Sequence, residues 1–372
     1  MTGAARPDRQ AGPALGVIVP CRNEAAVLAR KLRNLAACDW PPGRQRIVVV
    51  DDGSTDGSAE LAASLGAELF GAPDSRATLQ VLPNTDAPGK TGAIRSALRE
   101  LRDVELLVLT DADVVLRAPS LAALAAALRE RPALGLACGR QEFVRDLHAD
   151  GSCRGLDGGE PAPAAEPYDL WTARVRAWES RRGRLFSVHG QLLAWPARLQ
   201  LSPTQGIAAD DLDLMFQVRD RGLRVELLPE ATFLEVKPQA GAARSDWQRR
   251  RAQAWFQVMQ GRATPPGAPL FDRVQLLTYR LVHRLASPAA HVVGGLLLLA
   301  LAAGLGVLLR GPGVAWTAAA LTGLAAGAAA LVLLIVSPLG RGARALTTQW
   351  PAIRAARAAG ASRVDRWDTP RT

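Results

Sequence analysis

Short apolar runs alternate with helix-like stretches along the first two thirds of the chain. In the helix-like stretches apolar residues recur every three or four positions, whereas the shorter runs are apolar throughout. Strands that are apolar throughout are buried on both faces, so the pattern predicts an α/β fold with a mostly parallel sheet between helices. The predicted strands are 16–20, 47–50, 78–82, 106–109 and 224–228; the predicted helices are 24–37, 57–65, 89–101, 168–181 and 210–221; and 146–166 is predicted to be a mobile loop.

Two long uncharged runs, 288–309 and 314–336, change the character of the last third of the chain. Each is long enough to cross a hydrocarbon core of roughly 30 Å as a helix. The short segment 310–313 separates them, so they predict a C-terminal two-helix transmembrane hairpin. The alternative is a pair of helices buried in a soluble domain. Basic residues beyond both outer ends, among them Arg284 and Arg341, predict that both chain termini lie in the cytosol.

The same pattern divides the chain into segments. Residues 1–14 are polar, which predicts a disordered N-terminus without a signal peptide. Residues 15–262 hold the α/β pattern and are expected to form one cytosolic domain. Residues 263–287 are expected to be a juxtamembrane linker or interfacial helix, and 338–372 a basic cytosolic tail.

The charge balance favours an anionic partner. Lys and Arg number 45 against 35 Asp and Glu, a net charge of +10, which suits a nucleotide, a nucleic acid or an acidic membrane surface. An Arg-rich composition bias would give the same balance. The basic residues cluster beside the uncharged runs rather than with aromatic residues, so we expect no nucleic-acid partner. The four cysteines form no Cys-x-x-Cys pair and are expected to be reduced thiols.

Polar, chemically active residues follow the ends of several predicted strands. In a parallel sheet these ends lie along one edge, where ligands of open α/β sheets bind. The segments concerned are Pro20-Cys21-Arg22-Asn23-Glu24, Asp51-Asp52-Gly53-Ser54, Gly89-Lys90-Thr91-Gly92 and Thr110-Asp111-Ala112-Asp113. The Asp51 segment would also suit a simple turn and helix cap, and Lys90 could be a solvated lysine at a helix start.

Asp111 and Asp113 are the strongest single pair. Two carboxylates one residue apart, directly after a buried strand, can hold one divalent cation together with substrate phosphates. Oxygen ligands suit both Mg²⁺ and Mn²⁺. The pair therefore predicts a metal-assisted enzyme acting on a diphosphate, although solvated turn residues often show the same spacing.

In their order along the chain, these segments resemble the inverting glycosyltransferases of family 2, which use nucleotide-diphospho-sugars on a GT-A type fold. The resemblance covers about residues 15–260. It implies donor-binding roles for a set of rim residues: Pro20, Arg22 and Glu24 hold the nucleoside, Asp51 or Asp52 meets the base, which is most often uracil, Lys90 lies near the donor, and Asp111 and Asp113 bind the metal.

The resemblance extends to an acceptor side. Asp210-Asp211-Leu212-Asp213-Leu214 resembles the family's Glu-Asp-x-Asp-Leu segment, which places the catalytic base at Asp211 and an acceptor-side acid at Asp210. Gly190 and Gln191 resemble further acceptor-side residues. The other interpretation is an acidic helix N-terminus stabilised by the helix dipole, and both can hold together.

A basic stretch before the uncharged runs resembles the Gln-x-x-Arg-Trp motif of polymer-forming relatives. Gln248 and Arg251 are present, but Ala252 replaces the tryptophan, which disfavours processive synthesis. Arg251 is expected near the donor diphosphate or a lipid phosphate; a juxtamembrane anchor for anionic lipid is the alternative.

The expected function is therefore a metal-dependent inverting glycosyltransferase in the cytoplasmic membrane, with its catalytic domain in the cytosol. It would move a sugar from a nucleotide-diphospho-sugar, by resemblance a UDP-sugar, to a hydroxyl of a lipid-linked or membrane-proximal acceptor. The alternatives are a processive polysaccharide synthase and a catalytically inactive nucleotide-sugar-binding or scaffold protein.

Overall fold

The computed structural model describes residues 14–144, 146–147, 153–154, 167–236, 242–263, 265 and 267–280. Both predicted membrane runs, the tail 338–372 and almost all of the N-terminal segment 1–14 lie outside these ranges. Within the described ranges no helix is long and apolar enough to cross a membrane. The predicted hairpin therefore stays a prediction.

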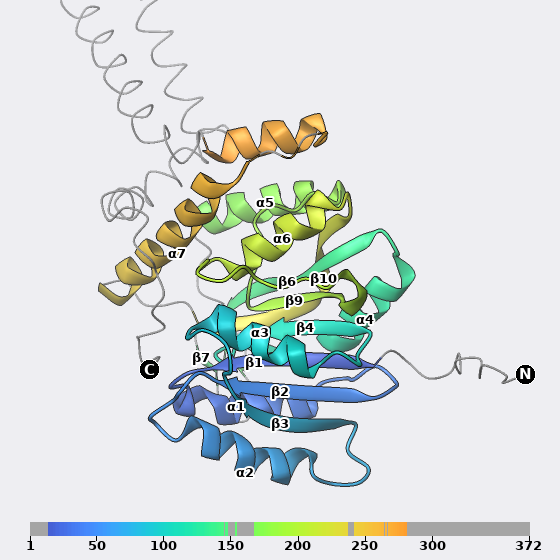
Figure 1. Ribbon diagram of the computed structural model, residues 1–372, viewed down its shortest axis with the longest axis vertical. Helices are drawn as coiled ribbons and strands as arrows, with labels where there is room; N and C mark the ends of the chain where they lie inside the picture. Colours follow the sequence, from blue (N-terminus) through green and yellow to red (C-terminus); the bar gives the residue numbers. More distant parts are fainter. Residues whose placement is uncertain are drawn as a thin grey trace, which may run out of the picture.

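The described part of the chain is built around one eight-stranded sheet (Figure 1). The strand order is β3-β2-β1-β4-β9-β6-β10-β5, with β3, β2, β1 and β4 parallel to one another. The bounds are β1 Leu15–Cys21, β2 Gln45–Asp51, β3 Ala77–Pro83, β4 Leu106–Thr110, β5 Val115–Leu116, β6 Leu134–Val144, β9 Leu192–Pro196 and β10 Arg224–Val236; β7 Asp146–Leu147 pairs with β8 Cys153–Arg154 apart from it.

The sheet is mixed, although six of its eight strands run in the same direction. β9 runs antiparallel to both β4 and β6, and β5 runs antiparallel to β10. The predicted strands did not include β5, β6 or β9, and the prediction ended β10 too early. β6 begins with small residues, Leu134-Gly-Leu-Ala-Cys-Gly139, which weaken an apolar signal, and β10 continues past a register shift between Leu228 and Thr232.

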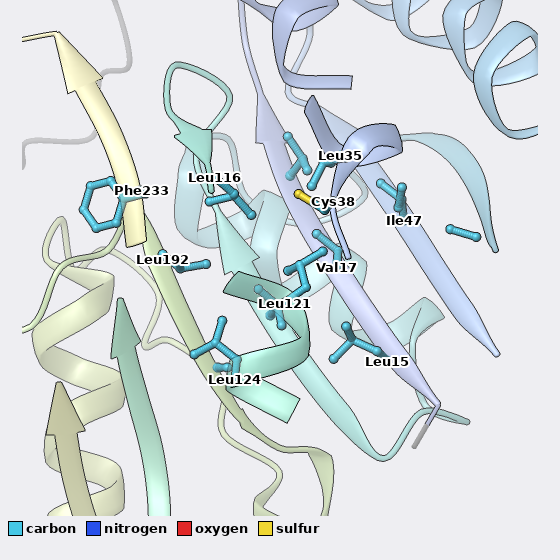
Figure 2. Packing of buried hydrophobic residues seen from close by; sticks show 14 of the residues in the cluster. Leu15, Val17, Leu35, Cys38, Ile47, Leu116, Leu121, Leu124, Leu192 and Phe233 are labelled. Atoms are coloured by element: carbon cyan, nitrogen blue, oxygen red, sulfur yellow. The ribbon is translucent and has the colours of Figure 1, made fainter. Parts of the chain in front are cut away.

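Helices cover both faces of the sheet, as the uniformly apolar strands predicted. Val17 and Val19 of β1 point into a core formed with α1, α2 and α4, which Figure 2 shows in part, whereas Ile18 points into a second core with α3, α6 and α7. The bounds are α1 Ala25–Ala37, α2 Ser58–Phe70, α3 Lys90–Glu100, α4 Ser120–Glu130, α5 Pro167–Arg181, α6 Asp210–Asp220 and α7 Ala242–Gly261, with a short η1 at Ala197–Leu199 and a further helix at 270–280.

The antiparallel strand β9 brings a distant segment to the edge where β4 ends. Leu192, the first residue of β9, pairs with Thr110, the last residue of β4. The backbone N–H of Asp111 donates to the carbonyl of Gln191 at 3.4 Å. Residues just before β9 therefore lie beside residues just after β4, because one strand begins where its neighbour ends.

Two polar residues on the buried face of α1 fix the segment after β4. Asn34 donates from Nδ2 to the carbonyl of Leu116 and accepts from its backbone N–H at Oδ1, both at 2.8 Å. Lys31, fully buried, donates from Nζ to Thr110 Oγ1 at 2.7 Å and to the Val114 carbonyl at 3.2 Å. α1 thus holds both ends of the 110–116 segment.

We expect Asn34→Ala to destabilise the protein by about 2–4 kcal/mol, because it leaves a buried N–H and a buried C=O of Leu116 without their partner. The midpoint of thermal unfolding should fall by roughly 5–10 °C. Arg33→Ala, on the exposed face of the same helix, is the matched control and should leave the midpoint within about a degree or two. Equal midpoints for the two variants would contradict this role.

Candidate functional site

A single lysine joins the end of β4 to the start of α6. Lys90 Nζ lies 2.7 Å from Asp111 Oδ1 and 3.6 Å from Asp210 Oδ2, and all three side chains are largely buried. Burial alone would lower the pKa of Lys90, but the carboxylates of Asp111 and Asp210 outweigh it and raise that pKa. Lys90 is therefore a permanent cation between two acids that the sequence places about a hundred residues apart.

Asp111 and Asp113 face the same side of the segment that follows β4. Both are half-buried, while Ala112 and Val114, which alternate with them, are buried in the core. In the described part of the chain no three His, Cys, Asp or Glu side chains are grouped so that they alone could hold a metal ion. A cation on Asp111 and Asp113 would need further oxygens from substrate or water, which is how Mg²⁺ is usually held beside phosphates.

Lys31 lies beneath this pair and was not recognised from the sequence. Burial lowers its pKa to about 8, and the nearby acids, Asp111 and Asp113 among them, work against that shift. Its two hydrogen bonds reach the residues on either side of Asp111-Ala112-Asp113. The available signal was its spacing: position 31 shares a helix face with Val27, Leu28 and Leu35, where a lysine must find a buried partner.

Asp211 lies against the backbone of Gly190. A Cβ added to Gly190 would meet Asp211 Cβ at 3.3 Å and Asp211 Oδ2 at 3.5 Å, so a side chain there would press on the carboxylate. Burial raises the pKa of both Asp211 and Asp210, while Lys90 lowers it. The predicted base and the predicted acceptor-side glycine are thus neighbours, as the resemblance implies.

The acidic residues at the start of α6 also form hydrogen bonds that stabilise the local structure. The Leu212 N–H donates to Asp211 Oδ1 at 2.8 Å, and Asp213 accepts from the Thr204 N–H at 2.7 Å. The loop before α6 is held from two other elements: Thr91 of α3 donates to the Ile207 carbonyl at 3.0 Å, and Gln257 of α7 contacts Gly206 and Ala208. These structural contacts and the predicted role of Asp211 as base are therefore compatible.

Asp51 and Asp52 have different surroundings at the end of β2. Asp52 is buried and accepts from Arg22 Nη1 at 3.1 Å, Asn84 Nδ2 at 2.5 Å and the Gly89 N–H at 2.8 Å. Asp51 Oδ2 accepts the N–H groups of Gly53 and Ser54, but its Oδ1 has no hydrogen-bond partner among the described residues. Asp51 is therefore the better placed of the two to meet a ligand.

The first two turns at this edge are locked together. Asn23, in the left-handed region at φ 52°, accepts from the Thr55 N–H, and its own N–H donates to Ser54 Oγ. The Glu24 N–H donates to the buried Ser58 Oγ at 2.9 Å. Pro20 lies inside β1 and is buried. Arg22 and Glu24, predicted to hold a nucleoside, are thus fixed by their neighbours rather than carried on a free loop.

Glu235, near the end of β10, is a further acid that sequence reasoning missed. It is buried, and it accepts hydrogen bonds from Gln141 and, at 3.4 Å, from Gln191. Burial, then Asp113, raises the pKa of Glu235 to about 7, while Arg251 opposes the shift. Arg251 of α7, an exposed residue, also lowers the pKa of Asp211. The predicted strand ended at residue 228, so Glu235 was recognised as part of β10 only in the structure.

His189 has a structural environment. It is buried, lies edge-on to Phe233 at 5.6 Å between ring centroids, and its Nε2 is 2.6 Å from Arg176 Nη1. Burial and the adjacent arginines hold the pKa of His189 well below its usual value, so the ring is neutral and accepts from Arg176.

The α/β sheet, which carries carboxylates and a lysine along its carboxyl edge, has a GT-A-like fold. The family model described as "Glycosyltransferase like family 2" matches residues 13–255, more than half of the chain. The chain therefore belongs to this family and is a glycosyltransferase.

Individual relatives agree with that assignment. The mannosyltransferase PcManGT from Pyrobaculum calidifontis, solved in complex with GDP-Man and Mn²⁺, is 27% identical with a TM-score of 0.60, over 95% of this chain and 88% of that one. An N-acetylglucosaminyltransferase of Rhizobium leguminosarum bv. viciae is 28% identical over 66% of this chain and 56% of its own length. A beta-monoglucosyldiacylglycerol synthase of Nostoc sp. is 31% identical over 101 residues, 27% of this chain and 20% of that protein.

If Asp211 is the base, as predicted, we expect Gly190→Ala to lower the rate of sugar transfer about ten-fold or more, because the added Cβ would shift the Asp211 side chain by a fraction of an ångström. Gly190→Val should lower it further. Nucleotide binding, measured by calorimetry, and the unfolding midpoint should stay close to wild type. A rate that does not fall across the Gly, Ala, Val series would contradict the close fit of Gly190 to Asp211.

Proposed function

We propose that this protein is a metal-dependent inverting glycosyltransferase that moves a sugar from a nucleotide-diphospho-sugar to a hydroxyl of a lipid-linked or membrane-proximal acceptor. One observation carries the proposal: Lys90 contacts both Asp111 and Asp210. The acids assigned to the donor diphosphate and those assigned to the acceptor therefore face one space, as a transfer between the two substrates requires.

On the donor side, the nucleoside would lie over the ends of β1 and β2. Arg22 is held by Asp52, and Asp51 Oδ1 has no hydrogen-bond partner among the described residues. Lys90 adds positive charge where the diphosphate would lie, and Arg251 adds more from α7. UDP is the nucleotide that the resemblance favours, whereas the solved mannosyltransferase holds GDP-Man, so the base is open to test.

Asp111 and Asp113 would hold the metal. Their hard carboxylate oxygens suit Mg²⁺ or Mn²⁺, and Mn²⁺ is bound in the solved mannosyltransferase. Bound there, a divalent cation would stabilise the negative charge that develops on the leaving diphosphate.

On the acceptor side, Asp211 would act as general base. Its carboxylate takes the proton of the acceptor hydroxyl while that oxygen attacks the anomeric carbon, and the bond from that carbon to the diphosphate breaks with its electron pair left on the diphosphate oxygen. Attack from the face opposite the leaving group inverts the anomeric configuration. The raised pKa of Asp211 makes it a stronger base than an exposed aspartate.

Two features support an acceptor at the membrane. The uncharged runs 288–309 and 314–336 would anchor the domain on the cytosolic face of the cytoplasmic membrane. The name of the Nostoc relative refers to a glucosylated diacylglycerol. Ala252, at the position of a tryptophan in polymer-forming relatives, favours a single transfer over processive synthesis.

Asp211→Asn should lower kcat by about 100-fold or more, because an amide cannot take the proton of the acceptor hydroxyl. Nucleotide affinity should change little. Asp220→Asn, the same substitution near the other end of α6, is the matched control and should retain most of the wild-type activity. Full turnover by Asp211→Asn would remove Asp211 from the role of base.

Asp111→Asn should raise the Mn²⁺ or Mg²⁺ concentration that gives half-maximal activity by about ten-fold or more, since it removes one of two anionic ligands. The measurement is a metal titration of released nucleotide. Asp74→Asn, an exposed aspartate elsewhere in the domain, is the control. If Asp111→Asn and wild type titrate alike, or if chelators leave wild type active, the metal assignment is wrong.

A further inference from the structure

The helix at 270–280 packs one side against the domain and leaves large hydrophobic residues on the other side. The inward side holds Leu276, which joins the second core, together with Asp272, Gln275 and Tyr279, whereas Leu270, Val274 and Leu277 are 73%, 53% and 55% exposed. Their spacing of four and three residues places these three on one helical stripe. A helix on the surface of a soluble domain normally carries polar residues on its outward side, so an exposed apolar stripe there is unusual.

Specific contacts fix the rotation of this helix. Asp272 Oδ1 lies 2.8 Å from Arg219 Nη2 and 3.2 Å from Arg184 Nε. Gln275 Nε2 and Tyr279 OH both donate to Glu179 Oε1 of α5, at 2.6 and 3.0 Å. Because these partners are largely buried in the domain, the helix cannot turn its apolar stripe inward without breaking them. The outward orientation of the stripe is thus fixed by specific contacts.

An aromatic residue of α5 extends the stripe. Trp178 is 41% exposed, and its ring lies 5.5 Å from that of Phe271, centroid to centroid. Of the five large hydrophobic residues that are exposed in the described part of the chain, three form the stripe and Trp178 packs on Phe271 of the same helix. Single exposed hydrophobic residues are ordinary, but a contiguous group marks an interaction surface. In Figure 1 the helix, in orange, lies beside α5 at the end of the molecule remote from α2.

Basic residues surround this group. Arg182 stacks over Trp178, with its guanidinium carbon 4.1 Å from the ring, and Arg181 and Arg273 are exposed nearby in sequence. Tryptophan rings and arginines around an apolar stripe suit the boundary between anionic headgroups and acyl chains. The first uncharged run begins at residue 288, eight positions after Arg280, so the same short stretch of chain leads to the predicted membrane span.

We propose that Trp178, Leu270, Val274 and Leu277 form a bilayer-docking face that lies in the interfacial layer of an anionic membrane and sets the orientation of the catalytic domain. This inference rests on the membrane placement in the proposed function and deepens it. The partner is the lipid surface itself. The uncharged runs anchor the domain, and this face adds a second membrane contact that restricts tilting of the domain.

The test measures depth in the full-length protein in nanodiscs that contain anionic lipid. Cys153 is changed to Ser, and an environment-sensitive fluorophore is attached at Val274→Cys or, as control, at Glu68→Cys on the exposed side of α2. Lipids brominated near the top of the acyl chain should quench the Val274 label by about half or more, at the depth where interfacial helices lie, and leave the Glu68 label unquenched.

Equal, weak quenching at both positions would overturn the proposal. So would a Val274 label with blue-shifted but unquenched emission, because it would mean that protein covers the stripe, either the chain's own apolar runs or a second copy. Quenching requires no turnover, so the result for this face does not depend on whether the proposed transfer reaction is found.

A variant with charged residues in the stripe tests whether docking affects activity. Val274→Glu combined with Leu277→Glu should lower transfer to a lipid acceptor in the bilayer about ten-fold, while metal-dependent donor hydrolysis stays at the wild-type level, because the charges oppose docking and lie outside the catalytic rim. Lipid transfer equal to that of wild type would contradict a docking role.

Discussion

The ion pairs of Lys90 are the interaction on which the rest of the site depends. Asp111 and Asp210 both lie within 3.6 Å of one ammonium, and carboxylates in such a partly buried site repel one another unless a cation lies between them. Lys90 supplies that cation, bonded to Asp111 and close to Asp210. It joins the end of β4 to the start of α6, and its ammonium stays charged because both neighbours raise its pKa.

The positions of these acids depend on two less visible devices. β9 enters the sheet antiparallel, so Gly190 and Gln191 precede a strand yet lie beside Asp111, which follows one. Beneath, Lys31 and Asn34 of α1 bind the backbone at 114 and 116, so a helix from the start of the fold sets the position of Asp111 and Asp113. The placement of these acids therefore depends on buried polar contacts as well as on apolar packing.

A further polar network joins the site to the proposed membrane face. Glu179 accepts hydrogen bonds from Gln275 and Tyr279. Asp272 forms an ion pair with Arg219 of α6, and the first turn of this helix carries Asp210 and Asp211. The outward stripe of the 270–280 helix is therefore connected to the acceptor-side acids through one rigid element. A domain oriented by that stripe would present the base to the bilayer in a reproducible direction.

The sequence by itself determined the α/β class, most helices, the first four parallel strands and the rim acids, because hydrophobic periodicity and strand-end chemistry are local signals. It did not determine β5, β6 and β9, the length of β10, or the roles of Lys31 and Glu235. Those depend on pairing between distant segments: β9 is specified by its neighbours β4 and β6, and the buried positions of Lys31 and Glu235 exist only after the sheet and helices pack. The joining of Asp111 to Asp210 through Lys90 was likewise decided only in three dimensions, since the range of a salt bridge is a distance in space and not in sequence.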